Sequence, residues 1–310
     1  MVTKEDYSYD AVVITGPTAS GKTSLAAALA DRLGGEVISA DSRQVYRRMN
    51  LGTGKDYSDY IVDGRQVPFH LIDIVDPGYK YNLFEFQCDF LRAYNDIVSR
   101  GRLPVVCGGS GMYIDSIVSG YRLAEVPPDP ELRMELEGMT LDQLTEILKK
   151  YKKLHNITDV DTVKRAVRAI EIERYYEKNR GMIRDFPVIK CLVTGVLYDR
   201  ETRRERISQR LKERLDAGMV QEVQSLLAEG VDRETLMYYG LEYKYITMYL
   251  TGVLTYDEMY RRLEVAIHQF AKRQMTWFRG MERKGVCIRW LDGEMPLEEK
   301  IGRIISWLKQ

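Results

Sequence analysis

Cysteine and histidine are scarce in this chain of 310 residues, and their positions exclude two kinds of stabilised domain. The sequence has four cysteines and three histidines. The cysteines form no C-x-x-C pair, and no histidine stands at a metal-ligand spacing from them. We therefore expect neither a structural zinc site nor a framework of disulfides.

Net charge and long apolar runs are absent as well. Lysine and arginine together number 46, as do aspartate and glutamate, so no overall field draws the chain toward nucleic acid or anionic membranes. No uninterrupted apolar stretch approaches the length of a membrane span, and the N-terminus lacks the basic and apolar regions of a signal peptide. These features predict a cytoplasmic protein without membrane association, in which local basic patches bind any polyanion.

The most informative feature present is a phosphate-binding loop. An apolar segment at residues 11–15 leads into a G-x-x-x-x-G-K-[ST] motif, and a helix-forming segment follows. In such a loop, backbone N–H groups and the helix N-terminus converge on phosphate oxygens. Lys22 supplies a mobile cation, and the Thr23 hydroxyl can complete the ligand shell of Mg²⁺. The loop predicted to bind a diphosphate or triphosphate, as in ATP-binding proteins, comprises Gly16, Pro17, Thr18, Ala19, Ser20, Gly21, Lys22 and Thr23.

Strand-like and helix-like segments alternate after this loop. Short apolar strands are predicted at residues 11–15, 36–40, 70–75 and 104–107, and helical periodicity marks residues 83–99. This alternation predicts an α/β fold with a parallel sheet flanked by helices, as in P-loop NTPases. Because the carboxyl ends of parallel strands meet at one edge, ligands bind there. The side chains expected to face the phosphate site are Asp41, Ser42, Asp73, Asp76 and the residues of the glycine-rich turn 108–111.

The chain changes character after Tyr121. A proline-rich break at residues 127–130 precedes a helical, charge-dense stretch that runs from Glu131 to about Asn179, which predicts an inserted all-helical domain. An apolar strand at 188–197 then rejoins the sheet, and a last strand at 286–290 precedes a C-terminal helix. The predicted domains are residues 1–121 for the first part of the core, 122–186 for the insertion, and 187–310 for the rest of the core and the C-terminal helices.

The residues around the phosphate loop favour group transfer over hydrolysis. Hydrolases with such a loop usually carry an apolar strand that ends in acidic residues, but here the strand at 104–107 ends in Gly-Gly-Ser-Gly, although Asp73 or Asp76 could replace the acidic residues. The carboxylate of Asp41, at the end of the second strand, is better placed to face an acceptor substrate than to face a hydrolytic water. A small-molecule kinase, an isopentenyltransferase acting on a free nucleotide, and a nucleotide-switched binding module remain alternatives. The basic helical insertion favours a large acceptor.

Five segments in succession resemble the motifs of bacterial tRNA dimethylallyltransferases. These segments are residues 16–23, 39–46 with Gly52 and Thr53, 70–74, 108–113 and 271–280. Their order and approximate spacing match the family over nearly the whole chain. The resemblance implies transfer of a dimethylallyl group from dimethylallyl diphosphate to N6 of the adenosine 3′-adjacent to the anticodon, with release of diphosphate and with Mg²⁺ as cofactor. The implied partner is the anticodon stem-loop of tRNA, and we expect the enzyme to be a monomer.

The resemblance also implies roles for individual residues. Asp41, by position and by similarity, is the base that accepts the N6 proton, while Lys22, Thr23 and Arg210 act on the diphosphate. The residues implied to contact tRNA are Asp41, Ser42, Arg43, Gln44, Ser110, Arg133, Lys164, Arg165, Arg168, Tyr243, Lys244, Lys272, Arg273 and Arg279. The alternatives are a solvated helix face for Arg210 and the other basic residues, a plain turn for Ser110, and packing in the core for Tyr243. Residues 161–163 and 238–245 depart from the family pattern, and Glu242 stands where glycine is expected.

Overall fold

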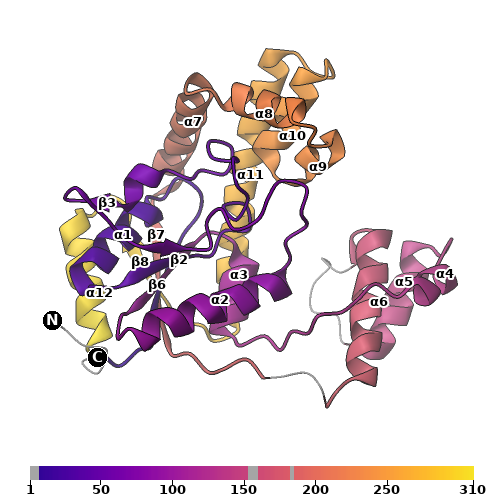
Figure 1. Cartoon of the computed structure of the whole chain (residues 1–310), viewed down its shortest axis with the longest axis horizontal. Coiled ribbons are helices and arrows are strands. Elements are labelled where there is room, and N and C mark those ends of the chain that lie inside the picture. Colours follow the sequence, from indigo (N-terminus) through magenta and orange to yellow (C-terminus); the bar gives the residue numbers. More distant parts are fainter. Residues whose placement is uncertain (1–6, 153–159, 182–184) are drawn as a thin grey trace. The chain divides into compact units, whose positions relative to one another are not determined.

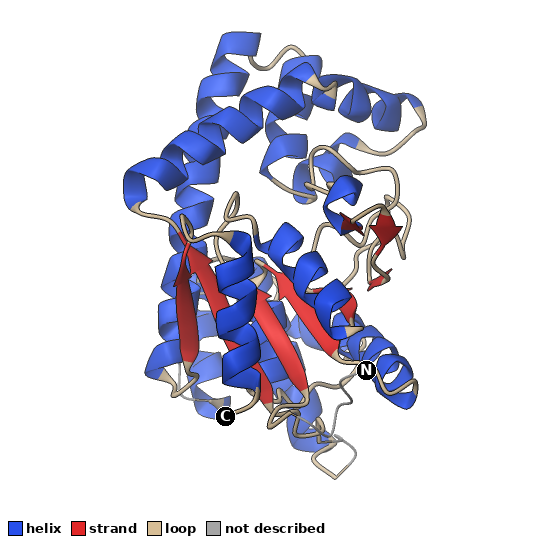
Figure 2. Ribbon diagram, turned by 90° about the vertical axis from the view of Figure 1, so that its left-hand side faces the viewer, coloured by secondary structure: helices blue, strands red, loops and turns tan. Residues whose placement is uncertain are grey.

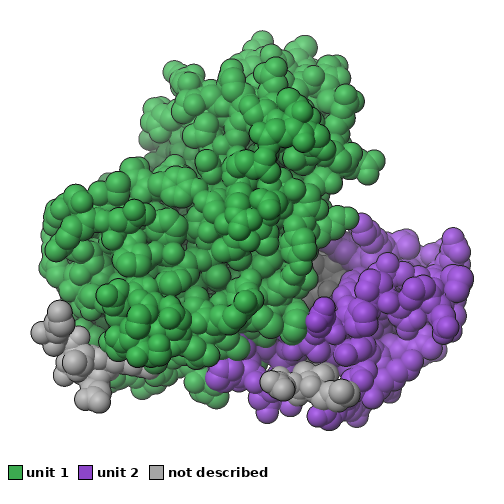
Figure 3. Space-filling view, viewed as in Figure 1, with its two compact units in different colours: residues 1–120, 188–310 green, residues 121–187 purple. Residues whose placement is uncertain are grey.

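A computed structural model of the protein describes residues 7–152, 160–181 and 185–310. The chain divides into two compact units (Figure 3), of which one comprises residues 1–120 and 188–310 and the other residues 121–187. The first unit carries a central sheet and most of the helices (Figure 1). Among the described residues, no helix is both long and apolar enough to cross a membrane.

The first unit is built on a six-stranded sheet with the order β5-β2-β6-β1-β7-β8. Every neighbouring pair in this sheet is parallel, as predicted (Figure 2). The strands are β1 (Ala11–Thr15), β2 (Glu36–Ser39), β5 (Phe69–His70), β6 (Pro104–Gly108), β7 (Cys191–Leu197) and β8 (Ile288–Asp292). The strand β1 is fully buried because it lies between β6 and β7, with Ile14 opposite both Cys107 and Thr194. An apolar sequence such as AVVIT is therefore what this central position requires.

Helices cover both faces of the sheet (Figure 2). The helices of this unit are α1 (Lys22–Leu33), α2 (Leu83–Ser99), α3 (Gly111–Val118), α7 (Arg200–Asp216), α8 (Met219–Ala228), α9 (Arg233–Tyr238), α10 (Leu241–Leu250), α11 (Tyr256–Arg283) and α12 (Leu297–Leu308). One core cluster joins Leu25 and Leu29 of α1 to Ile304 of α12 and to β1. The 3₁₀-helix η2 (Tyr57–Tyr60) and the hairpin of β3 (Ile61–Val62) and β4 (Arg65–Gln66) follow the second strand.

Three predicted strands differ from the structure. The strand predicted at 188–197 begins three residues later, at Cys191. The strand predicted at 70–75 is wrong beyond His70, because β5 ends there and both Leu71 (φ 63°) and Asp73 (φ 56°) adopt left-handed conformations that an extended strand excludes. Only Val75 returns to strand geometry, in an isolated bridge with Tyr46. The last strand begins at Ile288, two residues later than predicted.

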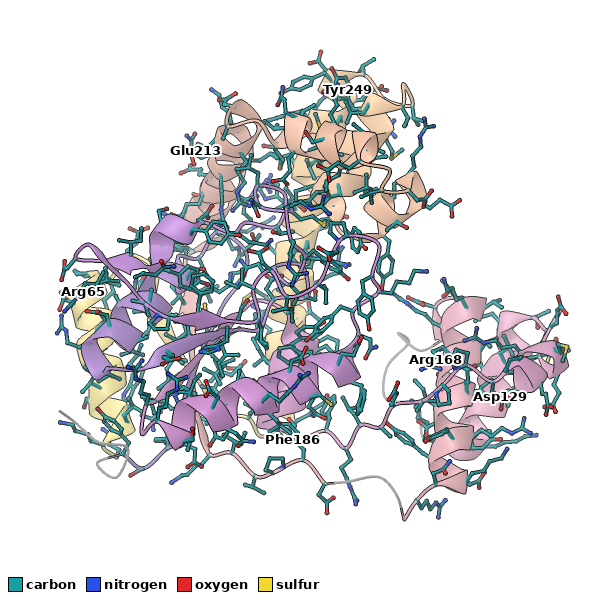
Figure 4. All side chains as sticks on the ribbon, viewed as in Figure 1. Arg65, Asp129, Arg168, Phe186, Glu213 and Tyr249 are labelled. Atoms are coloured by element: carbon teal, nitrogen blue, oxygen red, sulfur yellow. The ribbon has the colours of Figure 1, made fainter. Side chains whose placement is uncertain are left out.

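The second unit consists of three described helices with a core of their own. They are α4 (Pro130–Glu135), α5 (Leu141–Tyr151) and α6 (Val163–Lys178). Their apolar faces meet in a cluster that includes Leu132, Leu144 and Ile170. Asp129 caps α4 by accepting a hydrogen bond from the backbone N–H of Leu132, with proline at the first helical position. The labels of Asp129 and Arg168 in Figure 4 mark this unit.

Candidate active site

The phosphate loop lies between the carboxyl end of β1 and the first turn of α1. Gly16 (φ 151°) approaches β7 so closely that a Cβ atom would lie 2.6 Å from the carbonyl oxygen of Val196. Gly21 precedes α1 in a left-handed conformation and brings no side chain to cap the helix. The first N–H groups of α1 are therefore available to an anion.

Lys22 points back toward the loop that precedes it. Its ammonium group donates a hydrogen bond to the carbonyl oxygen of Pro17 at 3.3 Å. Burial lowers the pKa of Lys22, and the nearby guanidinium group of Arg210 acts in the same direction. A diphosphate would relieve both effects because it brings negative charge to this position.

A cleft of about 790 Å³ opens over the phosphate loop. Its lining residues come mainly from the loop and the start of α1, from Asp56 and η2, and from α7; they include Lys22, Thr23, Asp56, Asp59, Arg206 and Arg210. Within it Arg210 donates a hydrogen bond to Asp56 at 2.6 Å, and Arg214 donates to the same carboxylate at 3.2 Å. The structure thus brings Arg210 to the loop, and the fully solvated helix face considered for it does not describe its environment.

The ends of β2 and β6 meet at a second cluster, as their position in the sheet requires. Asp41 Oδ1 accepts a hydrogen bond from the backbone N–H of Arg43 at 2.9 Å, while its Oδ2 atom has no hydrogen bond among the described residues. The backbone N–H of Ser42 donates to Ser110 Oγ at 3.0 Å, which joins the two strand ends directly. Asp41 therefore has one fixed oxygen and one oxygen that is free to accept a proton.

Gln274 of α11 connects the phosphate loop to the glycine-rich turn, and it is absent from the residues predicted individually. Its Oε1 accepts a hydrogen bond from the Thr18 N–H at 2.9 Å, and its Nε2 donates to the carbonyl oxygen of Gly109 at 2.8 Å. The side chain is buried. Its place in the motif at 271–280 is the only sequence signal that points to it, because the bridge joins positions more than 160 residues apart.

Two side chains that the sequence places at the site are engaged elsewhere. Asp73 forms an ion pair with the buried Lys55 and accepts from the Tyr57 hydroxyl, so it does not face the phosphate loop as predicted. The Gln44 amide is occupied at both ends, by Ser39 Oγ at 2.9 Å and the Gly54 carbonyl at 3.1 Å. These two residues hold the segment that bears Asp56.

Tyr243 has no exposed surface, so the prediction that it stacks on RNA is replaced by a structural role. Its hydroxyl donates to Glu222 Oε1 at 2.6 Å, and its ring packs on Gly52, where a Cβ atom would lie 2.6 Å from the ring. Glu222 also accepts from the backbone N–H groups of residues 50, 51 and 52 at 2.7–3.0 Å. The neighbouring Lys244 is exposed.

The basic residues predicted to contact tRNA differ in their surroundings. On α11, Lys272, Arg273 and Arg279 are exposed. In the second unit, Arg133 donates to the buried carboxylate of Glu171 through two nitrogens at 2.9 and 3.1 Å, and Arg168 donates to the same carboxylate. Although burial acts to raise it, these arginine hydrogen bonds hold the pKa of Glu171 below its usual value. The two arginines therefore stabilise their own unit.

Lys164 and Arg165 lie at the exposed start of α6, where Arg165 forms a surface ion pair with Asp161. Such a surface pair contributes little to stability. Arg165 can consequently exchange Asp161 for a phosphate at small cost.

A parallel sheet with a phosphate loop after its first strand defines a P-loop protein. Residues 44–281 match the protein family described as IPP transferase, and residues 9–67 match that described as isopentenyl transferase. The chain is 61% identical over 300 residues to tRNA dimethylallyltransferase 2 of Phocaeicola vulgatus, covering 97% of this chain and 98% of that protein. It is 62% identical over 302 residues to the protein of the same name in Bacteroides fragilis, covering 97% and 99%.

A solved structure supports the same assignment. The full-length tRNA isopentenylpyrophosphate transferase of Bacillus halodurans superposes with a TM-score of 0.70 at 31% identity, covering 96% of this chain and 95% of that one. The chain belongs to the IPP transferase family, and it is a prenyltransferase enzyme. The predicted resemblance is therefore confirmed.

Proposed function

We propose that this enzyme transfers a dimethylallyl group from dimethylallyl diphosphate to N6 of the adenosine 3′-adjacent to the anticodon of tRNA, and releases diphosphate. The observation that carries the proposal is the single edge of the sheet that bears both a phosphate loop and the free oxygen of Asp41. The relatives and the Bacillus halodurans structure are named for tRNA, which favours tRNA over a free nucleotide as acceptor. All of these groups come from one chain, which supports an enzyme that acts as a monomer. Its proposed location is the cytoplasm, as the sequence predicts.

The donor diphosphate occupies the cleft over the phosphate loop. Loop N–H groups, Lys22 and Arg210 surround it with positive charge, which stabilises the charge that develops on the leaving group. The hydroxyl of Thr23 lines this cleft and is a hard oxygen ligand of the kind that Mg²⁺ takes. No group of three or more His, Cys, Asp or Glu side chains in the described part of the chain could hold a metal. A Mg²⁺ ion held by Thr23, with water and diphosphate oxygens completing its shell, would neutralise charge on the leaving group.

Asp41 acts on the acceptor. The exocyclic amine of adenine is a weak nucleophile because its lone pair is delocalised into the ring. As the bond from N6 to C1 of the dimethylallyl group forms, the C1–O bond breaks and its electron pair leaves with the diphosphate. The N6 proton passes to Asp41, whose Oδ2 is free while Oδ1 stays fixed to the Arg43 N–H. General-base catalysis of this kind contributes about 10²–10⁴-fold.

Local basic surfaces hold the RNA while the acceptor base is removed from its stack. Extrusion of a base costs a few kcal/mol, which contacts elsewhere must offset. The exposed side chains of Lys272, Arg273 and Arg279 on α11 provide such contacts. Arg203 of α7 lies near Arg279, and burial together with the charge of Arg279 lowers the pKa of Arg203. Lys164 and Arg165 provide a second basic surface on the inserted unit.

One incubation tests the proposal. The enzyme is mixed with dimethylallyl diphosphate, Mg²⁺ and bulk tRNA lacking the modification, and the nucleosides are then analysed by mass spectrometry. We expect N6-dimethylallyladenosine in tRNA, no such product from free adenine nucleotides, and no consumption of ATP. Product on free nucleotides alone, or ATP hydrolysis stimulated by tRNA without prenylated adenosine, would overturn the proposal.

A further inference from the structure

Tyr238 and Arg43 form an exposed stacking pair beside the acceptor edge of the sheet. Tyr238 is the last residue of α9, and 55% of its surface is exposed. The guanidinium carbon of Arg43 lies 5.3 Å from the centre of its ring. Among the described residues the Arg43 side chain has neither a carboxylate partner nor a hydrogen bond, so its donors are available to a ligand.

The buried residue next to Tyr238 is held firmly in place. Tyr239, which is fully buried, packs its ring 4.3 Å from that of Tyr46 and makes an edge contact with Tyr238. The Tyr239 hydroxyl accepts from the Gly78 N–H at 2.5 Å and donates to the carbonyl oxygen of Tyr79 at 2.9 Å. The backbone next to Tyr238 is therefore held in place before any ligand binds, which lowers the cost of ordering this part of the site.

The position of the pair connects it to the acceptor. The backbone N–H of Arg43 holds Asp41, and the Arg43 side chain lies over Tyr238. Asp41, Arg43 and Tyr238 all lie close enough to the hydroxyl of Tyr113 to act on its pKa, which burial raises. An aromatic ring and a planar guanidinium at an RNA acceptor site match the groups on which unstacked bases are held.

We propose that Arg43 and Tyr238 hold, by stacking, an RNA base next to the acceptor adenosine. This inference rests on the proposed function. When the adenosine is extruded, the adjacent base loses its stacking partner, and the pair binds that base. The pair thus positions the RNA and takes no part in the proton transfer at Asp41. The segment 238–245, which bears Tyr238, is also one in which the sequence departs from the family pattern.

The test compares Tyr238→Ala with Tyr238→Phe, and it uses Tyr256→Ala as the matched control because Tyr256 is a 44% exposed tyrosine on α11. Each variant is titrated with an anticodon stem-loop RNA that the wild type prenylates. Loss of one stacked base corresponds to about 5- to 150-fold in Kd. We expect that loss for Tyr238→Ala alone, with the dependence of log Kd on log salt unchanged, because the phenol carries no charge. The rate at saturating RNA and the affinity for the donor should stay within a few-fold of the wild type.

RNAs that lack one base identify the partner. Removing the base that stacks on the pair should weaken binding to the wild type and have no further effect in Tyr238→Ala. Arg43→Lys, which keeps the charge but loses the planar group, should weaken binding at an unchanged salt slope. The inference would be overturned if Tyr238→Ala bound the RNA with the same Kd as the wild type, or if Tyr238→Phe lost as much affinity as Tyr238→Ala. In either case, prenylation by the wild type would still support the proposed function. Absence of prenylation by the wild type would overturn the proposed function itself.

Discussion

At the scale of single residues, a substitution of Asp41 distinguishes an effect on RNA binding from an effect on the chemical step. Its Oδ1 atom is held by the Arg43 N–H, an interaction that an asparagine oxygen retains. Asp41→Asn should therefore keep the loop in place and leave the Kd for tRNA within a few-fold of the wild type. The proton acceptor is lost, so we expect the single-turnover rate to fall by about 10²-fold or more. A variant that no longer binds tRNA but reacts rapidly once bound would show that Asp41 positions the RNA instead.

Gln274, which is distant from the phosphate loop in the sequence, holds the loop by a direct hydrogen bond. Gln274→Ala leaves the Thr18 N–H and the Gly109 carbonyl without their partner. An unsatisfied buried polar group costs about 1–3 kcal/mol, so we expect a lower free energy of unfolding in urea and a higher Kd for dimethylallyl diphosphate. Thr276→Ala is the control, because Thr276 is an exposed residue on the same helix that bonds only to the carbonyl of Lys272 within α11. Donor binding as tight in Gln274→Ala as in the control would contradict a positioning role.

At the scale of elements, Glu36 joins the edge strand β5 to the sheet. The carboxylate of this first residue of β2 is buried, and it binds Arg100, Arg102 and the His70 ring of β5. Although burial acts to raise it, hydrogen bonds from Arg100, His70 and Arg102 lower the pKa of Glu36 to about 2 from 4.5. A folded-state pKa below the unfolded value stabilises the fold above the unfolded pKa, and this contribution is lost as the pH falls through the folded pKa.

Glu36→Gln should lower the free energy of unfolding near neutral pH by about 1.5–3 kcal/mol, the range for hydrogen bonds to a charged group. The difference from the wild type should shrink as the pH falls from 4.5 toward 2, the two pKa values that bound the transition. Urea denaturation across a pH series measures both quantities. Glu299→Gln removes an exposed helix pair with Arg303 and should change stability by less than about 0.5 kcal/mol. If the difference in free energy of unfolding between the wild type and Glu36→Gln stayed constant across this pH range, the prediction would be contradicted.

The elements differ in how far the sequence determines them. The strand β1, the loop at 16–23 and the helix α2 could be predicted because each is set by a local pattern: an apolar run, a spaced glycine motif and the helical spacing of apolar residues at 83–99. The segment after His70 could not, because Leu71 and Asp73 adopt left-handed conformations that the apolar pattern of residues 70–75 does not indicate.

The candidate site shows the same division. Asp41, Ser42 and Ser110 meet because strand ends in a parallel sheet share an edge, which the sequence predicts. The burial of Tyr243, the bridge made by Gln274 and the two arginines on Glu171 depend on contacts between distant segments. No spacing of residues in the sequence distinguishes such contacts from surface positions.

At the scale of the whole molecule, a chain with equal numbers of acidic and basic residues must bind RNA through separate basic surfaces. Lys272 and Arg273 represent the surface on α11, and Lys164 and Arg165 represent the inserted unit. Arg168 is omitted because it binds the buried Glu171, and its loss would disturb the fold of that unit. Each pair of basic residues can therefore be removed with small effects on stability.

The double alanine variants of these two pairs should weaken every substrate tRNA alike, because phosphate contacts carry no sequence information. Each lost contact should flatten the slope of log affinity against log salt by about 0.7–0.9. A third variant, Arg303→Ala with Lys309→Ala, removes the same charge from exposed positions on or just beyond α12 and should leave the slope unchanged. Affinity for dimethylallyl diphosphate should be the same in all three. An unchanged slope for the variant of Lys164 and Arg165 would mean that these residues form a solvated face and that the grip on RNA lies along α11.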